Sequence, residues 1–135
     1  MEKAFEFLRK HKDVAFSTVE ENRPKIRVFQ VMKIDGRNLY FATSARKEVY
    51  AQLVKNPAIE LLAMEGNVSV RISGDAVFDV DDAVAREIYE ENLVLPRLYA
   101  SYRDLVYFRL PIRSMDYYDL TPTPPEQKHI EYGQE

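Results

Sequence analysis

The feature that most constrains the fold is a strict alternation of side chains between residues 67 and 78. One face of this segment carries apolar or small residues at every second position, namely Val68, Val70, Ile72, Gly74, Ala76 and Phe78. The other face carries Asn67, Ser69, Arg71, Ser73 and Asp75. Successive side chains of a strand point to opposite faces of a sheet, so this period of two predicts a long strand with one buried face. An antiparallel sheet that is covered on one side shows this pattern.

Turn sequences divide much of the remaining chain into short strands. The strand-like segments are rich in β-branched and aromatic residues and cover 13–19, 25–34, 39–43, 58–64, 105–110 and 114–120. Typical turn compositions lie between several of them, at 21–24, 35–38 and 65–67. Pro111 separates the last two segments. Six or seven short strands, largely connected as hairpins, predict a mainly β protein, an antiparallel β-barrel with peripheral helices.

Other segments repeat their apolar residues every three or four positions, which predicts helices. We expect helices at 2–11 and 45–55, and a third that opens between Asp79 and Asp82 and ends near Leu93. A further helical or irregular stretch follows around residues 96–101. These elements form a single domain over residues 1–120, and residues 121–135 form a polar, proline-rich C-terminal tail.

Composition argues against several classes of function. The 135 residues suit one domain, and 19 basic against 22 acidic residues, a formal charge of -3, argue against a nucleic-acid partner. There is no cysteine and the only histidines are His11 and His129, so neither a cysteine nucleophile nor a multi-histidine metal site is expected. No apolar run approaches the roughly 20 residues of a membrane span, and the charged N-terminus is unlike a signal peptide. We therefore expect a soluble, cytoplasmic protein.

The most informative candidate site is the junction between the strand at 39–43 and the helix at 45–55. Free backbone N–H groups and the positive end of the helix dipole favour an anion at such a position. Thr43 and Ser44 add hydroxyl groups there, while Arg46 and Lys47 place positive charge in the first helical turn. That charge has the wrong sign for the helix dipole unless an anion is bound. The alternative is that Ser44 is an ordinary N-cap and both cations are solvated.

A second candidate is the strand at 25–34, where Lys25, Arg27 and Phe29 share one face. An arginine beside an aromatic ring suits a flat anionic ligand, because the guanidinium can chelate a phosphate or stack on a ring. The alternative is an edge strand with a merely charged outer face. No glycine-rich phosphate loop, serine elbow or metal-binding helix motif is present, which argues against dehydrogenases and hydrolases of those types.

Several stretches occur in a characteristic order: residues 22–31, residues 35–43, Ser44 with Lys47, and residues 54–61. In this order they resemble the pyridoxamine 5′-phosphate oxidase-like family of FMN-binding split barrels. The resemblance runs from about Val14 to Phe78, and the later strands agree in order and length. It implies a six- to seven-stranded antiparallel split barrel that binds FMN at the interface of a homodimer.

The resemblance also implies where the cofactor lies. The phosphate would be held by the basic and hydroxyl side chains of Arg27, Thr43, Ser44, Arg46 and Lys47. The isoalloxazine ring would be bordered, mainly by backbone, at Val28, Phe29 and Gln30, with Gln52 as a further candidate from the helix. Ser69 and Arg71 occupy a strand that in family members can reach the phosphate or the partner's site.

The function that follows from the resemblance is an FMN-dependent oxidoreductase acting on an unknown small molecule, with NADH or NADPH as electron donor. The chemistry would reside in the flavin, so no catalytic side chain is nominated. True pyridoxamine phosphate oxidases carry a characteristic Arg- and His-containing C-terminal segment that residues 115–135 do not match, so we do not expect a true pyridoxamine phosphate oxidase. No histidine is well placed to ligate haem. Two alternatives remain open: a flavin carrier or sensor without turnover, and a structural barrel without a ligand.

Overall fold

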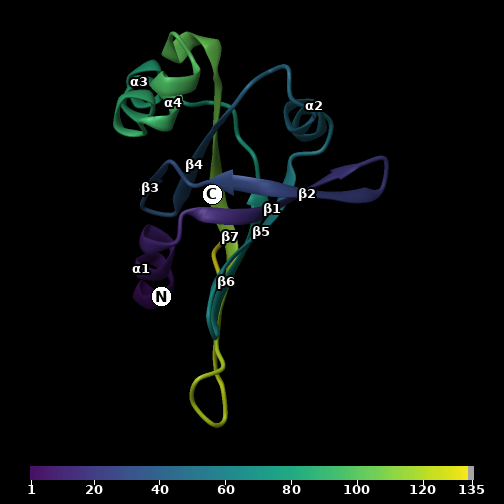
Figure 1. Cartoon of the computed structure of the whole chain (residues 1–135). Coiled ribbons are helices and arrows are strands. Elements are labelled where there is room, and N and C mark those ends of the chain that lie inside the picture. Colours follow the sequence, from purple (N-terminus) through teal and green to yellow (C-terminus); the bar gives the residue numbers. More distant parts are fainter. Residues whose placement is uncertain (134–135) are drawn as a thin grey trace.

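The structure, a computed structural model, describes residues 1–133 of the chain as strands surrounded by short helices (Figure 1). The strands are β1 (Asp13–Glu20), β2 (Arg23–Gln30), β3 (Lys33–Asp35), β4 (Asn38–Thr43), β5 (Ala58–Glu65), β6 (Val68–Asp75), β7 (Val106–Asp119) and β8 (Glu126–Glu131). The helices are α1 (Glu2–Lys10), α2 (Glu48–Lys55), α3 (Asp82–Glu91), α4 (Val94–Leu98) and the 3₁₀ helix η1 (Tyr102–Asp104). No helix within residues 1–133 is long and apolar enough to cross a membrane.

The strands form one strongly curled antiparallel sheet. Its order is β2-β1-β5-β6-β7-β4-β3, and β8 pairs with β7 outside this path. Strand β7 pairs with β4 along its first half and with β6 and β8 along its second half. The helices lie around the sheet, with α3 and α4 together at one corner (Figure 1). The prediction of a mainly β antiparallel split barrel with peripheral helices is confirmed.

The segment 25–34, expected as one strand, is two strands because the backbone changes its partner between Val31 and Met32. The Val31 N–H donates to the Lys12 carbonyl at 2.8 Å and so continues the pairing with the β1 side. The Met32 N–H donates to the Tyr40 carbonyl at 2.9 Å, which starts the pairing with β4. The chain therefore crosses from one half of the barrel to the other at this point.

Pro111 does not end a strand, contrary to the prediction of two separate final strands. It lies opposite Asn38 in the last pair between β4 and β7, and from Ile112 onward β7 pairs with β6. The missing N–H thus falls where the strand exchanges one partner for another, a position at which a sheet tolerates proline. The expected C-terminal tail also differs from the structure, because residues 126–131 within it form β8 on the edge of β7.

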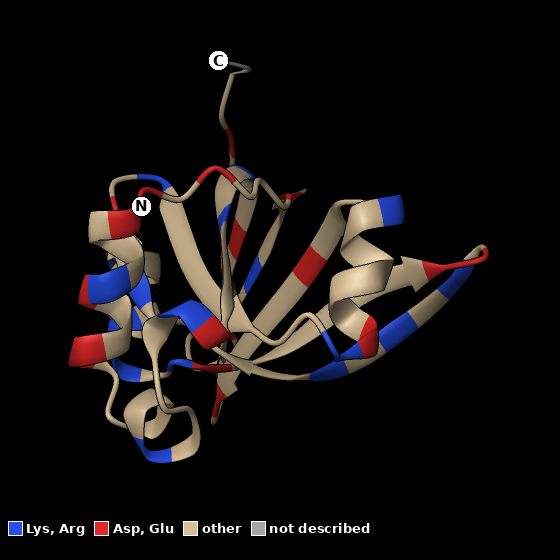
Figure 2. Ribbon diagram, turned by 90° about the horizontal axis from the view of Figure 1, so that it is seen from above, with Lys and Arg blue, Asp and Glu red and all other residues tan. Residues whose placement is uncertain are grey.

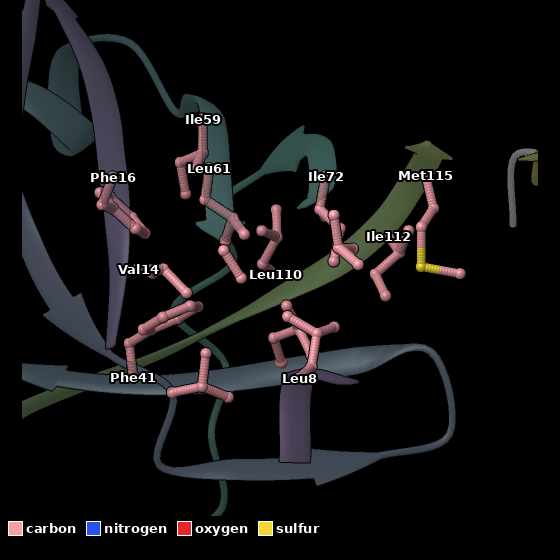
Figure 3. Close-up of a cluster of buried hydrophobic side chains, with 14 of the residues drawn as sticks. Leu8, Val14, Phe16, Phe41, Ile59, Leu61, Ile72, Leu110, Ile112 and Met115 are labelled. Carbon is pink, nitrogen blue, oxygen red and sulfur yellow. The ribbon is translucent and has the colours of Figure 1, made fainter. Parts of the chain in front are cut away.

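The core fills the concave side of the sheet, here called the inner face. Figure 3 shows side chains from β1, β4, β5, β6 and β7 that point toward one another, among them Phe16 and Phe41. The predicted alternation is confirmed within β6, since Val70 and Ile72 are fully buried while Arg71 between them is exposed; the strand ends at Asp75, however, and Phe78 beyond it is 37% exposed. At Gly74 the backbones of β6 and β7 approach too closely for a side chain, because a Cβ atom there would lie 2.6 Å from the Pro111 carbonyl oxygen.

A second apolar cluster lies under α3 and α4, where Ile88 and Leu95 pack near Tyr107 of β7. Polar contacts fix these helices to the barrel. Lys33 of β3 forms an ion pair of 2.6 Å with Glu87 of α3, and this pairing raises the pKa of Lys33. Burial raises the pKa of Tyr107 to about 12, and the Tyr107 hydroxyl donates to the Tyr102 carbonyl at 3.0 Å. Tyr107 therefore stays neutral and serves the packing of this corner.

Candidate functional site

A hydrogen-bonded cluster joins β1, β2 and α2 on the inner face of the sheet. The Arg27 Nη1 group donates to the Thr18 hydroxyl at 2.8 Å and to the Phe16 carbonyl at 3.3 Å. The Arg27 Nη2 group donates to Gln52 Oε1 at 2.7 Å, and the Thr18 hydroxyl donates to the same oxygen at 2.5 Å. We call Thr18, Arg27 and Gln52 the Arg27 cluster.

The guanidinium of Arg27 is partly buried and therefore partly desolvated. Desolvation lowers the pKa of Arg27 below its ordinary value, and the nearby negative charge of Glu48 opposes this effect. A guanidinium nevertheless stays protonated in proteins. Three of its five N–H groups serve the cluster, so the Nε group and one Nη2 hydrogen have no protein acceptor among the described residues. The cluster therefore holds a positive charge in a fixed position and leaves two N–H groups of Arg27 able to donate to a ligand.

Two buried polar groups have no partner within residues 1–133: the Nε2 group of Gln52, which belongs to the cluster, and the hydroxyl of Thr43 at the end of β4. Their side chains belong to residues that are only 2% and 3% exposed, respectively. Leaving a buried donor unpaired costs about 1 to 3 kcal/mol, and native proteins rarely accept this cost without a reason. Both groups were nominated from the sequence, and both can donate a hydrogen bond to a ligand.

The junction after β4 differs from the prediction. Helix α2 begins at Glu48 rather than near residue 45, and residues 44–47 form a turn. The Ser44 hydroxyl accepts from the Arg46 N–H at 3.2 Å, and such local bonds of serine compete with helix formation. Ser44 is therefore not the N-cap, and Arg46 and Lys47 precede the first turn of α2. The first turn carries Glu48, whose sign suits the helix dipole.

The turn still places functional groups at the start of α2. Lys47 is the N-cap residue of α2, has an extended backbone, and makes no side-chain cap bond. The side chains of Arg46 and Lys47 are exposed, and Ser44 is half-buried. The positive charges expected here are thus accessible from solvent beside the buried Thr43.

Strand β2 forms one edge of the sheet, so its outer backbone groups have no neighbouring strand. Val28 points away from the core and is 72% exposed. Phe29 points inward, with its ring centroid 4.7 Å from that of Phe16. The Gln30 Nε2 group donates a long hydrogen bond of 3.4 Å to the Asp13 carboxylate. Val28, Phe29 and Gln30 can therefore offer backbone groups to a ligand, while the Phe29 ring packs in the core. Figure 2 shows the basic positions that recur along β2.

The structure separates the remaining candidates from the Arg27 cluster. Arg71 lies on the convex side of the sheet, here called the outer face, and forms ion pairs with Asp116 at 3.3 Å and Glu60 at 3.6 Å. Ser69 lies on the same face. Because Arg27 belongs to the inner face, Ser69 and Arg71 do not join its cluster within one chain.

Sequence reasoning missed Thr18, which the structure places at the centre of the cluster. A signal was present in the alternation of β1. Val14, Phe16 and Thr18 point to the same inner face, and all three are buried. A polar residue on an otherwise apolar buried face needs a hydrogen-bond partner, and here it has two.

The fold and the Arg27 cluster together define a split-barrel protein with a candidate anion site. The family model for pyridoxamine 5′-phosphate oxidase matches residues 1–110. The chain therefore belongs to the pyridoxamine 5′-phosphate oxidase-like family of FMN-binding split barrels. No curated protein sequence matches the chain.

Solved structures support the same fold. A NimC/NimA family protein from Clostridium acetobutylicum is similar with a TM-score of 0.78 at 22% identity, over 96% of this chain and 93% of that one. A pyridoxamine 5′-phosphate oxidase-related, FMN-binding protein from Nostoc punctiforme gives 0.73 at 15% identity, over 98% and 94%. A heme-binding protein from Mycobacterium smegmatis gives 0.74 at 15% identity, over 95% and 56%. At these identities the likeness shows the fold alone.

Proposed function

We propose that this protein binds FMN and is a flavin-dependent oxidoreductase for a small molecule. The observation that carries the proposal is the Arg27 guanidinium bonded to Gln52, whose buried Nε2 group has no partner within residues 1–133, together with the equally unpartnered Thr43 hydroxyl at the end of β4. A phosphate supplies only acceptors at neutral pH and forms strong bonds with charged donors. The residues present thus fit the anionic end of FMN.

Each group has a distinct part in holding the cofactor. Thr43 and Gln52 would satisfy their buried donors on the ligand, while Arg27 would add positive charge through its two remaining N–H groups. The turn before α2 would add further hydroxyl and basic groups to the site, from Ser44, Arg46 and Lys47. The unpaired edge of β2 would supply backbone donors and acceptors along Val28, Phe29 and Gln30. The flavin supplies the electron-transfer chemistry when bound, with NADH or NADPH as its electron donor.

The position of the histidines favours FMN over haem, although one similar structure is that of a heme-binding protein. His11 lies at the end of α1, with its ring centroid 4.4 Å from that of Phe7. His129 lies in β8 and contacts the Asp116 carboxylate at 2.6 Å, and this contact raises the pKa of His129. Neither imidazole belongs to the Arg27 cluster.

Lys47 gives the direct test of the cofactor. We expect the purified protein to take up FMN and to show flavin absorbance after dialysis. Lys47→Ala should weaken FMN binding about tenfold. A hydrogen bond to a charged group contributes about 1.5 to 3 kcal/mol, and because Lys47 is exposed we expect a loss near the lower value of this range. Lys55→Ala, at the other end of α2, is the matched control and should bind as the wild type does.

The same FMN-binding measurement also distinguishes an oxidoreductase from a flavin carrier and from a barrel without a ligand. A protein that shows no flavin absorbance after reconstitution is a barrel without this ligand, and the proposal is then wrong. A yellow protein that neither NADH nor NADPH reduces without oxygen is a carrier or sensor.

We also propose that the protein is a homodimer that uses the outer face of β1, β2 and β5. Apolar side chains are exposed there on neighbouring strands: Ile26, Val28, Leu62 and Met64. The pairings of Val28 with Ala15 and of Ala15 with Leu62 place these strands in one continuous row. Contiguous apolar surface of this kind suits a protein partner, and a second copy of the chain supplies an identical face.

Val28→Glu is expected to convert the dimer to a monomer, because it places a charge in the middle of this apolar row. Light scattering coupled to gel filtration measures the mass directly. The matched control is Leu93→Glu, which changes a side chain that is 77% exposed beside α3 and should leave the dimer intact. A monomeric wild-type protein, or a dimer that survives Val28→Glu unchanged, would contradict this interface.

A further inference from the structure

We propose that Thr18 is a positioning residue, whose hydroxyl holds the Gln52 amide in the one orientation that directs its N–H groups toward the ligand. This inference rests on the proposed FMN site and adds to it a residue that does not touch the cofactor. Thr18 is only 1% exposed, and its hydroxyl is already bonded to Arg27 and Gln52. Its effect on a ligand must therefore pass through these two side chains.

The orientation of the amide follows from the donors around it. Gln52 Oε1 accepts from the Thr18 hydroxyl at 2.5 Å and from Arg27 Nη2 at 2.7 Å. If the amide were reversed, its NH₂ group would face the guanidinium, and two donors would meet without an acceptor. The hydrogen-bond pattern thus fixes which atom of the amide faces the cluster and leaves Nε2 as the group that has no partner in the described part of the chain.

Thr18 completes a directed chain of hydrogen bonds. Its oxygen accepts from Arg27 Nη1 at 2.8 Å, and its single hydrogen is donated to Gln52 Oε1 at 2.5 Å. The cation thereby sets the direction of the hydroxyl, and the hydroxyl reinforces the orientation of the amide. Such a network presents donors to the ligand, and a deprotonated phosphate has the acceptors that match them. Riboflavin, which lacks the phosphate, gains much less from this arrangement.

Thr18→Val tests the inference because valine keeps the branched shape of threonine and replaces its hydroxyl with a methyl group. The binding of FMN and of riboflavin to each variant is measured by the quenching of flavin fluorescence. Thr18→Val should weaken FMN binding about three- to tenfold, the effect of about one net hydrogen bond. The affinity for riboflavin should change much less, so that the preference for FMN over riboflavin falls. Thr18→Ser restores the hydroxyl and should restore the preference.

A second background shows whether Thr18 acts through Gln52. In the Gln52→Leu protein, addition of Thr18→Val should cause no further loss of FMN affinity, because the amide to be positioned is gone. If the two losses add, or if Thr18→Val weakens FMN and riboflavin equally, the positioning role is wrong. The proposed FMN site stands in either case.

Failure of the proposed function would be recognised separately. If the wild-type protein takes up no FMN, the cofactor site is wrong, and the amide is followed instead by nuclear magnetic resonance of the ligand-free protein. The side-chain N–H signals of Gln52 are assigned by their loss in Gln52→Leu. Altered Gln52 signals in Thr18→Val would support the orientation by Thr18, and unaltered signals would overturn it.

Discussion

Replacement of Arg27 by methionine is expected to weaken FMN binding by about tenfold to a hundredfold and to destabilise the fold by about 1 to 3 kcal/mol. The loss of affinity follows from removal of the one charged group among the residues of the Arg27 cluster. The loss of stability follows because the Phe16 carbonyl and Thr18 each lose a donor, and Gln52 Oε1 keeps only the bond from Thr18. Methionine preserves much of the apolar stem of arginine, so the change reports on the guanidinium.

Arg23→Met is the matched control, because Arg23 is exposed on the same strand. Urea unfolding with and without FMN measures both effects, since a ligand that binds only the folded state raises its stability. The control should match the wild type in both measurements. An Arg27→Met protein that keeps the wild-type preference for FMN over riboflavin would contradict a role of Arg27 at the phosphate.

Phe16→Ala is expected to cost about 3 to 5 kcal/mol of unfolding free energy, which is a large part of the roughly 5 to 15 kcal/mol of a typical domain. Phe16 is fully buried, and its ring centroid lies 4.7 Å from that of Phe29, 5.2 Å from that of Phe41 and 6.1 Å from that of Phe108. The surrounding rings come from separate strands, so they cannot collapse easily into the space that alanine would leave. The midpoint of urea unfolding at a constant slope measures this loss.

Phe78→Ala provides the comparison for the aromatic core. Phe78 also contacts Phe108, at 5.6 Å between centroids, but it is partly exposed at the margin of the cluster. Its loss should cost clearly less than the loss of Phe16. Equal costs for the two substitutions would mean that burial at the centre of the barrel does not govern its stability.

The local elements could be predicted because each depends on a short period in the sequence. The alternation over residues 67–78 predicts one buried face of β6, and the turn at Glu21 and Asn22 closes the hairpin of β1 and β2 with positive φ angles of 49° and 65°. The three- and four-residue spacing predicts α1, α2 and α3. These periodic patterns were sufficient to predict a mainly β fold with peripheral helices.

The points at which strands change partners could not be predicted, because they depend on segments far away in the chain. The break between β2 and β3, the continuation of β7 through Pro111 and the pairing of β8 all arise from long-range hydrogen bonds. The start of α2 was placed too early because the turn from Ser44 uses the same residue types as a helix cap.

The candidate site could be predicted by residue type but not by arrangement. Arg27 and Gln52 were both nominated, yet nothing in the sequence shows that they bond to each other across 25 positions. Thr18 and Gln52 are 34 positions apart, so the bond between them required the fold. Arg71 shares the chemistry of Arg27 but lies on the opposite face of the sheet, a distinction that follows from the register of the strands.

The three partners of β7 have a consequence for how the barrel opens. This strand of 14 residues carries ladder hydrogen bonds to β4, β6 and β8, so each of these three strands loses a neighbour once β7 detaches. Such a shared strand couples distant parts into one cooperative unfolding unit. Binding energy gained beside β1, β2 and α2 therefore protects the whole domain from unfolding, and proteolysis far from the cofactor should slow when FMN is bound.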